Sequence, residues 1–259
     1  MLDELFAGSI ADAQKRRENV SLERVEKAAL SQTPALHALE FLAPGKQIKI
    51  LAEVKRASPS RGQMAEIPDP AALAKIYSEN GASAISVLTE ERKFKGSLED
   101  LISVRANVQV PLLRKDFIAN EYQILEARAA GADIILLIVA GLAQKDIERL
   151  KRFTDELGMT AFVETHSEDE LKRALDVDTR MVGINARDLS TFETDRNLFG
   201  KLVHLIPENV IKVAESAVRN ADDVAHYRAA GADVALVGEA LVTNDPAAML
   251  QSFLAAGKS

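Results

Sequence analysis

Charged side chains follow four apolar segments of the sequence that are rich in β-branched residues. Glu53 and Lys55 close the segment KILAEVK, Lys115 closes LLRK, Glu164 closes TAFVE and Glu215 closes IKVAE. Side chains alternate between two faces along a strand, so these charges share a face with apolar residues earlier in the same strand. Desolvated lysines and carboxylates pair and shift one another's pKa, which suits proton transfer. We therefore expect one layer of ionisable groups that carries acid–base chemistry.

Other polar residues at the ends of apolar segments fit this pattern less well. Asn185 closes MVGIN and joins the same layer. Thr89, Glu90, Arg114 and Asp116, each taken singly, are expected to be solvated starts of loops.

Two segments have the composition of anion-binding loops. Residues 56–69 (RASPSRGQMAEIPD) contain Ser, Pro and Gly, so they can bring Ser58 and backbone N–H groups near an anion. A long loop of this kind is either a surface loop or a lid. The segment 238–241 (GEAL) predicts a short helix whose N-terminal N–H groups can hold a phosphate.

Eight apolar segments of the sequence are predicted to be strands, which would position these residues. Amphipathic stretches, predicted to be helices, lie between the strands. Asp245-Pro246 predicts the start of one helix. The segments SLED (97–100) and SEDE (167–170) resemble capping boxes at the starts of two others. Strands alternating with helices predict a parallel sheet covered by helices. The expected strands are Ile48–Lys55, Ala84–Thr89, Val110–Lys115, Asp133–Val139, Thr160–Glu164, Arg180–Asn185, Val210–Glu215 and Asp233–Gly238.

A weak repeat favours a closed (β/α)8 TIM barrel over an open doubly wound sheet. NGASAISV, AGADIILL and AGADVALV each read as a glycine that ends a helix, then a strand, and their glycines (Gly81, Gly131 and Gly231) lie 50 and then 100 residues apart. No two glycines lie closer than Gly231 and Gly238, so the chain has neither GxGxxG nor a phosphate-binding Walker loop. We expect residues 1–259 to form a single barrel domain.

Residues 1–45 precede the first strand and are expected to form a helical extension, with helices over Glu4–Arg17 and Leu22–Leu30. This extension either plugs the bottom of the barrel, packs on its side, or covers the mouth of the active site. The sequence alone leaves these alternatives open.

Composition excludes several classes of function. The net charge of −7 gives no basic footprint for nucleic acid, and the absence of cysteine excludes disulfides, thiolate nucleophiles and cysteine-bound metals. The four histidines show no close pairing, so no metal site is expected. The longest apolar run, Ile134 to Ala140, is too short to span a bilayer, and the N-terminus has no apolar core of a signal peptide. We expect a cytoplasmic protein that binds neither nucleic acid nor membrane.

Five motifs together resemble the indole-3-glycerol phosphate synthase family of tryptophan biosynthesis. They are AEVKRASPSRG (52–62), LLRKDFI (112–118), GINARDL (183–189), AES (214–216) and LVGEAL (236–241). The resemblance covers essentially the whole chain, including the N-terminal extension. It implies a lyase that closes an indole ring on 1-(2-carboxyphenylamino)-1-deoxyribulose 5-phosphate with release of carbon dioxide and water. No cofactor or metal is implied, and we expect a monomer with a possible partner from the tryptophan pathway.

The resemblance also assigns catalytic roles. It implies that Lys115 is the general acid that protonates the substrate carbonyl and that Glu164 is the base of the later dehydration. Glu53, Asn185 and Glu215 would orient hydroxyls and tune the lysine. A lysine that acts as an acid must stay charged until transfer, so carboxylates must lie near it.

Binding residues follow from the same resemblance. Lys55 and Arg187 would face anionic parts of the substrate, and the phosphate would be held by Lys55, Ser58, Ser216, Gly238 and the backbone N–H of Glu239. Apolar walls for the aromatic ring would come from Phe94, Phe117, Leu136, Ile138, Leu189 and Leu236. Where the family commonly reads AESG, this chain has Ala217, whose methyl group could weaken phosphate binding.

Two alternatives remain at this stage. One is a related phosphate-binding barrel such as a phosphoribosyl isomerase, although EVKRASPS is not typical of those enzymes. The other is a non-catalytic module that binds a phosphorylated aromatic sugar or serves as a subunit of a pathway assembly. A binder has no need for Lys115, Glu164, Glu53 and Asn185 together, which favours the enzyme.

Overall fold

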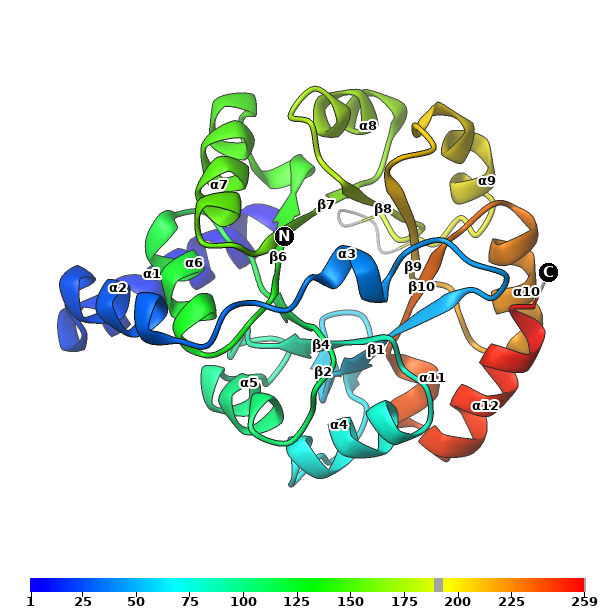
Figure 1. Cartoon of the computed structure of the whole chain (residues 1–259), viewed down its shortest axis with the longest axis horizontal. Coiled ribbons are helices and arrows are strands. Elements are labelled where there is room, and N and C mark those ends of the chain that lie inside the picture. The colour runs from blue at the N-terminus through cyan, green and yellow to red at the C-terminus, as the bar shows by residue number, and fades with distance from the viewer. Residues whose placement is uncertain (189–192, 259) are drawn as a thin grey trace.

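The computed structural model describes residues 1–188 and 193–258, and its centre is a closed barrel of eight parallel strands. Their order around the barrel is β1-β10-β9-β8-β7-β6-β5-β4 (Figure 1). This confirms the expected (β/α)8 barrel and excludes the open sheet. The strands are β1 (Lys49–Val54), β4 (Ala84–Leu88), β5 (Leu112–Lys115), β6 (Ile134–Ile138), β7 (Thr160–Thr165), β8 (Met181–Asn185), β9 (Ile211–Glu215) and β10 (Val234–Val237).

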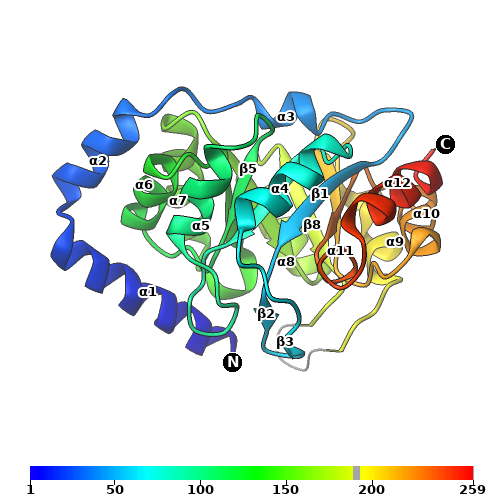
Figure 2. The same ribbon diagram turned by 90° about the horizontal axis from the view of Figure 1, so that it is seen from below.

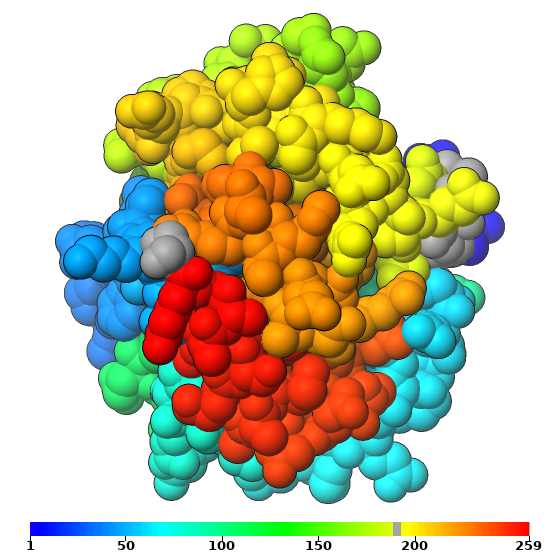
Figure 3. Space-filling view, turned by 90° about the vertical axis from the view of Figure 1, so that its right-hand side faces the viewer, coloured from blue at the N-terminus to red at the C-terminus, as the bar shows by residue number. Residues whose placement is uncertain are grey.

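Helices surround the barrel and begin where the sequence offers caps. The side chains of Ser97, Ser167 and Asp245 accept backbone N–H groups at the starts of α5, α8 and α12. Figure 3 shows α10 and α12, orange and red, packed together on the outer face. The helices after β1 are α4 (Pro70–Glu79), α5 (Leu98–Arg105), α6 (Glu121–Ala129), α7 (Gln144–Glu156), α8 (Glu168–Leu175), α9 (Leu198–Leu202), α10 (Ala221–Ala229), α11 (Glu239–Val242) and α12 (Pro246–Ala256), with 3-10 turns η1 (Val139–Gly141) and η2 (Val203–Leu205).

Three glycines end helices in the left-handed conformation that the repeat predicts. Gly81, Gly131 and Gly231 have φ of 95°, 91° and 101°. An L side chain is strained at such angles, so glycine allows a sharp turn from helix into the following strand. In the part of the chain that is described, no helix is long and apolar enough to cross a membrane.

The N-terminal extension reaches both ends of the barrel. It contains α1 (Leu2–Asn19), α2 (Leu22–Ser31) and α3 (Ala38–Phe41). Figure 2 shows the start of α1 at the same end of the barrel as the carboxyl ends of the strands, while α3 lies at the opposite end. Ala38 and Leu42 are fully buried there. The extension therefore both plugs the bottom of the barrel and extends toward its mouth.

The long loop after β1 contains an unpredicted hairpin. Two short antiparallel strands, β2 (Ala57–Ser58) and β3 (Gly62–Gln63), pair with each other. Arg56 anchors the base of this loop, because its guanidinium donates to the carbonyl of Ile67 and pairs with Asp100. The loop is thus a folded projection beside the barrel mouth.

The expectation that Thr89, Glu90, Arg114 and Asp116 are solvated is wrong. Thr89 and Glu90 are 3% exposed, Arg114 is 0% exposed and Asp116 is 4% exposed. Asp116 accepts hydrogen bonds from Ser9 of α1 (2.7 Å), Thr89 (2.6 Å) and Arg114 (3.0 Å).

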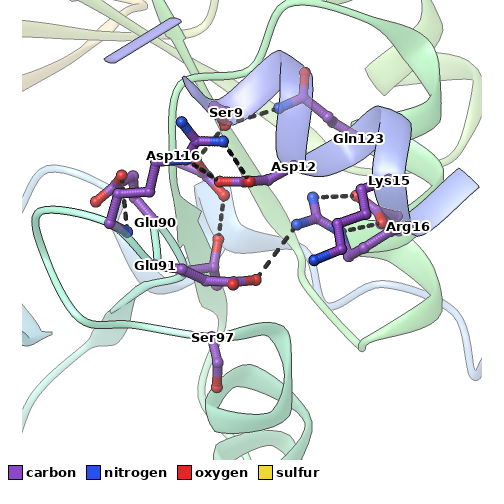
Figure 4. Close-up of polar contacts among 12 residues, drawn as sticks. Ser9, Asp12, Lys15, Arg16, Glu90, Glu91, Ser97, Asp116 and Gln123 are labelled. Atoms are coloured by element: carbon purple, nitrogen blue, oxygen red, sulfur yellow. Dashed lines mark hydrogen bonds and ion pairs between the residues drawn. The ribbon is translucent and has the colours of Figure 1, made fainter. Parts of the chain in front are cut away.

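The physical reason is that α1 covers these strand ends and removes the water that a bare barrel would offer. Figure 4 shows Ser9 and Arg16 of α1 reaching across to Asp116 and Glu91. Arg16 also pairs with Glu126 of α6 at 2.6 Å. Because buried charges need partners, this polar network fixes α1 against β5, immediately beside Lys115.

Candidate active site

A cavity of about 560 Å³ lies at the carboxyl ends of the strands. Parallel strands bring their ends to one edge of a barrel, so residues far apart in sequence meet there. The predicted residues that line this cavity are Glu53, Lys55, Ser58, Phe94, Lys115, Phe117, Leu136, Ile138, Glu164, Asn185, Arg187, Glu215, Ser216, Leu236, Gly238 and Glu239. Leu189 lies outside the described residues.

Lys115 lies between two carboxylates. Its Nζ is 2.8 Å from Glu164 Oε2 and 2.8 Å from Glu215 Oε2. Burial disfavours the ammonium form, but the charges of Glu164, Glu215 and Glu53 outweigh burial and raise the pKa of Lys115. The lysine is therefore a charged proton donor that faces the cavity.

The two carboxylates beside Lys115 differ in proton affinity. Burial favours neutral Glu164, but Lys115 and His166 outweigh it and hold the pKa of that carboxyl well below its usual range. Burial, together with the negative charge of Glu164, raises the pKa of Glu215 in spite of Lys115. Glu164 is therefore the stronger acid of the two carboxyl groups.

Asn185 connects this pair to the neighbouring loop. Its Nδ2 donates to Glu164 Oε1 at 3.0 Å, and its Oδ1 accepts from Ser216 Oγ at 2.8 Å and from the backbone N–H of Arg187 at 3.0 Å. The amide orientation is therefore fixed, and Glu164 Oε2 is turned toward Lys115.

Glu53 and Lys55 form a second ion pair at the end of β1. Lys55 Nζ lies 2.5 Å from Glu53 Oε1, and Glu53 is 2% exposed. A Cβ on Gly238 would lie 2.5 Å from Glu53 Oε1 and 3.1 Å from Lys55 Nζ. Glycine at 238 therefore makes room for this pair at the mouth of β10.

The backbone after β9 is unusual where it lines the cavity. Ser216 and Ala217 both have left-handed conformations, with φ of 68° and 58°. A glycine adopts this conformation without strain, so the two side chains are held here at a conformational cost. Both residues line the cavity in this conformation.

One ion pair and one hydrogen bond join the β2–β3 hairpin to the same region. Arg61 Nη2 lies 2.6 Å from Glu239 Oε1, so the carboxylate next to the expected phosphate seat is already neutralised. Arg187 Nη1 donates to Ser60 Oγ at 3.3 Å.

Aromatic side chains form the apolar wall, and α1 contributes to it. Phe117 contacts Phe94 with ring centroids 6.1 Å apart and meets Phe6 of α1 edge to face at 5.6 Å. Leu5 of α1 also lines the cavity. The N-terminal extension therefore covers part of the active-site mouth, the alternative that the sequence left open.

Four residues with a part in this site escaped sequence reasoning. Leu5 and Arg61 belong to segments whose position relative to the barrel has no local sequence signal. Gly183 lies next to Glu215, the partner of Lys115, and a Cβ added at Gly183 would lie 2.2 Å from Glu215 Oε1. His166 contacts Glu164 from behind the cavity. It follows Glu164 by two residues, a spacing that could have identified it. Across the described ranges, no cluster of three or more His, Asp or Glu side chains could hold a metal ion.

Comparison with known proteins gives consistent results. A family profile described as indole-3-glycerol phosphate synthase matches residues 2–253. The indole-3-glycerol phosphate synthase of Leifsonia xyli subsp. xyli is 62% identical over 98% of this chain and 97% of its own length. The protein of that name from Arthrobacter sp. strain FB24 is 50% identical over 99% of this chain and 96% of its own length.

Solved structures agree on the fold. A thiamine phosphate pyrophosphorylase from Pyrococcus furiosus matches with a TM-score of 0.61 and 15% identity over 82% of this chain and 95% of that one. At this identity the likeness concerns the barrel alone.

Proposed function

Since the chain belongs to the indole-3-glycerol phosphate synthase family, we propose that it closes the indole ring of 1-(2-carboxyphenylamino)-1-deoxyribulose 5-phosphate. The aryl carbon that bears the carboxylate attacks the ketone carbon of the sugar chain. The carboxylate then leaves as carbon dioxide, and loss of water completes the aromatic ring of indole-3-glycerol phosphate. The overall change is a carboxy-lyase reaction.

The substrate would lie across the cavity with its two anionic groups apart. Its phosphate would contact the backbone of residues 216–217 and 238–239, and Lys55, Ser58 and Arg187 would supply further donors. Its aromatic ring would stack in the apolar part of the cavity, against Phe94 and Phe117. The protein carries a net charge of −7, so a local group of cations and N–H donors must supply the attraction.

Lys115 would act as the general acid in ring closure. It donates its Nζ proton to the ketone oxygen as the new carbon–carbon bond forms, and the alkoxide that would otherwise develop becomes a hydroxyl group. Apolar walls around the substrate carboxylate favour its loss, because they stabilise a neutral product better than a charged ground state.

Glu164 would act as the base of the dehydration. It is ionised beside Lys115, so it accepts the ring proton, while Lys115, which has regained a proton from solvent, protonates the hydroxyl group that leaves as water. Glu53, Asn185 and Glu215 would hold the lysine and the sugar hydroxyls in place. Leu5 lines the cavity, so we include the N-terminal extension in the active unit.

The observation that carries this proposal is the position of Lys115 between Glu164 and Glu215 at the floor of a cavity with an aromatic wall. An isomerase of phosphorylated sugars has no need for such a wall, and a binding module has no need for a buried proton donor.

A fluorescence assay for indole-3-glycerol phosphate tests the proposal. We expect product from the wild-type protein and a loss of kcat by about 10²–10⁴-fold in Lys115→Ala, the range for a general acid. Lys172→Ala removes a lysine that is 59% exposed on α8 and is the matched control, with unchanged kcat. Folded wild-type protein that forms no product would disprove the function, and full activity in Lys115→Ala would disprove the role of the lysine.

A further inference from the structure

His166 lies directly behind the proposed base. It follows β7, and Ser167 then caps α8, so one short turn joins Glu164 to that helix. The imidazole Nε2 is 3.3 Å from Glu164 Oε1, and Nδ1 is 3.1 Å from Glu170 Oε2. The side chain is 10% exposed and does not line the cavity.

The carboxylates of Glu164 and Glu170 determine the charge of the His166 ring. A neutral imidazole carries only one N–H, so one of its nitrogens would turn a lone pair toward a carboxylate oxygen. The doubly protonated ring places an N–H near each. Burial opposes the charged form, but the contacts with Glu164 and Glu170 outweigh it and raise the pKa of His166 to about 10.

Glu170 is held in place to receive this charge. Its Oε2 also accepts the backbone N–H of His166 at 2.8 Å, and its own N–H donates to Ser167 Oγ. His166 Nε2 is buried without a well-aligned hydrogen bond, so its interaction with Glu164 is mainly charge attraction. A fixed cation thus lies next to Glu164 on the side away from substrate.

Glu164 and Glu215, the two carboxylates beside Lys115, have different charged neighbours. In the described part of the chain, salt bridges give Glu164 two cationic partners, Lys115 and His166, but give Glu215 only Lys115. Glu53, which also acts on Lys115, is negative. His166 is thus the counter-charge that Glu164 has in addition to Lys115.

This asymmetry matters when Lys115 gives up its proton. At that moment Glu164 loses one of its two cations, and a buried carboxylate without a counter-charge takes up a proton. The proton of Lys115 could then pass to Glu164 instead of to the substrate, and no base would remain for the dehydration. A second cation that is not consumed prevents this.

We propose that His166 is a positioning residue that, as a fixed imidazolium between Glu164 and Glu170, keeps Glu164 ionised while Lys115 transfers its proton. The inference rests on the proposed function. It assigns to His166 no contact with substrate, only control over the charge of the base.

The pH dependence of kcat tests this role. In His166→Gln the cation is lost, so the acid limb, which reports protonation of Glu164, moves up by about 1–2 pH units. The ratio of kcat at pH 4 to kcat at pH 8 then falls by up to about tenfold, while KM changes less than threefold. His204→Gln replaces an exposed histidine of η2 and is the control, with an unchanged profile. An equal loss of kcat at every pH would show that His166 only packs, and would overturn the proposal.

Two further measurements keep the inference testable if His166→Gln does not fold. Glu170→Gln removes one carboxylate partner, so His166 loses its proton at lower pH and kcat gains a new decline above about pH 8; an unchanged alkaline limb contradicts the proposal. The imidazole ¹⁵N shifts of the wild-type protein at pH 8 should show two protonated nitrogens. A neutral ring there overturns the role of His166 without touching the proposed function, whereas a wild-type protein without turnover overturns both.

Discussion

Gly183 is the residue whose substitution tests the catalytic geometry most directly. It lies on β8, paired with Glu164 of β7 and Val213 of β9. An added Cβ would lie 2.2 Å from Glu215 Oε1, and 2.7 and 2.8 Å from two ring carbons of Phe162. Contacts on both sides leave no open direction for the methyl group, so Gly183→Ala must displace the carboxylate.

The size of the effect follows from these distances. Restoring an ordinary van der Waals contact requires a shift of Glu215 by roughly 1 Å. That shift breaks the 2.8 Å contact with Lys115. A displacement of about 1 Å in an active site costs on the order of 10²-fold in rate, or about 2.7 kcal/mol. Overpacking also lowers the free energy of unfolding by about 1–3 kcal/mol, which leaves the protein folded at 25 °C.

The assay is kcat for indole-3-glycerol phosphate formation, with thermal unfolding followed by circular dichroism. Gly200→Ala on α9 is the matched control, because its nearest neighbour would be Ala230 Cβ at 3.8 Å. A double-mutant cycle with Glu215→Asp sharpens the test. The shorter side chain removes the clash with the carboxylate but not that with Phe162, so the further loss of kcat from Gly183→Ala should be much smaller in that background. Folded Gly183→Ala with kcat within twofold of wild type would refute the reasoning.

Two further predictions concern the backbone and the network under α1. Ala217→Gly removes a left-handed alanine (φ of 58°) and should raise the free energy of unfolding by roughly 0.5–1 kcal/mol without raising KM; a lower Tm would contradict this. Asp116→Asn leaves the buried Arg114 with the longer ion pair to Glu126 (3.4 Å) and should cost about 1.5–3 kcal/mol in urea unfolding at pH 7, against less than about 0.5 kcal/mol for the exposed control Glu168→Gln. The pKa of Asp116 is lowered: burial raises it, but Arg114, Thr89 and Ser9 outweigh burial. Its stabilising effect is therefore present above the ordinary pKa of 3.8 and is lost as pH falls through the lower folded-state pKa, so the cost of Asp116→Asn should shrink in acid.

The sequence predicts the barrel well because its pattern is local. Each apolar segment predicted to be a strand is a strand in the structure, with ends that differ from the predicted ends by at most two residues. The layer of Glu53, Lys115, Glu164 and Glu215 was likewise predictable, because strand alternation alone assigns these side chains to the inner face.

Other features depended on contacts between distant segments and escaped prediction. Arg114 and Asp116 look solvated until α1 is placed over them. His166 lacks a partner in its own sequence pattern other than Glu170, and its contact with Glu164 depends on how β7 turns into α8. Residues that act through a neighbour leave weaker sequence signals than residues that end strands.

The hydrogen bond between Ser9 and Asp116 also bears on how the protein is made. The two residues are 107 positions apart in the sequence, and Arg16 is 110 positions from its partner Glu126. At ordinary rates of synthesis α1 spends roughly 5–20 s outside the ribosome before its docking site exists. The strand β1 can pair early with β4, but its other partner, β10, begins only at Val234. The aromatic wall of Phe6, Phe94 and Phe117 can therefore form when about half of the chain has been made, whereas the barrel can close only near the end of synthesis.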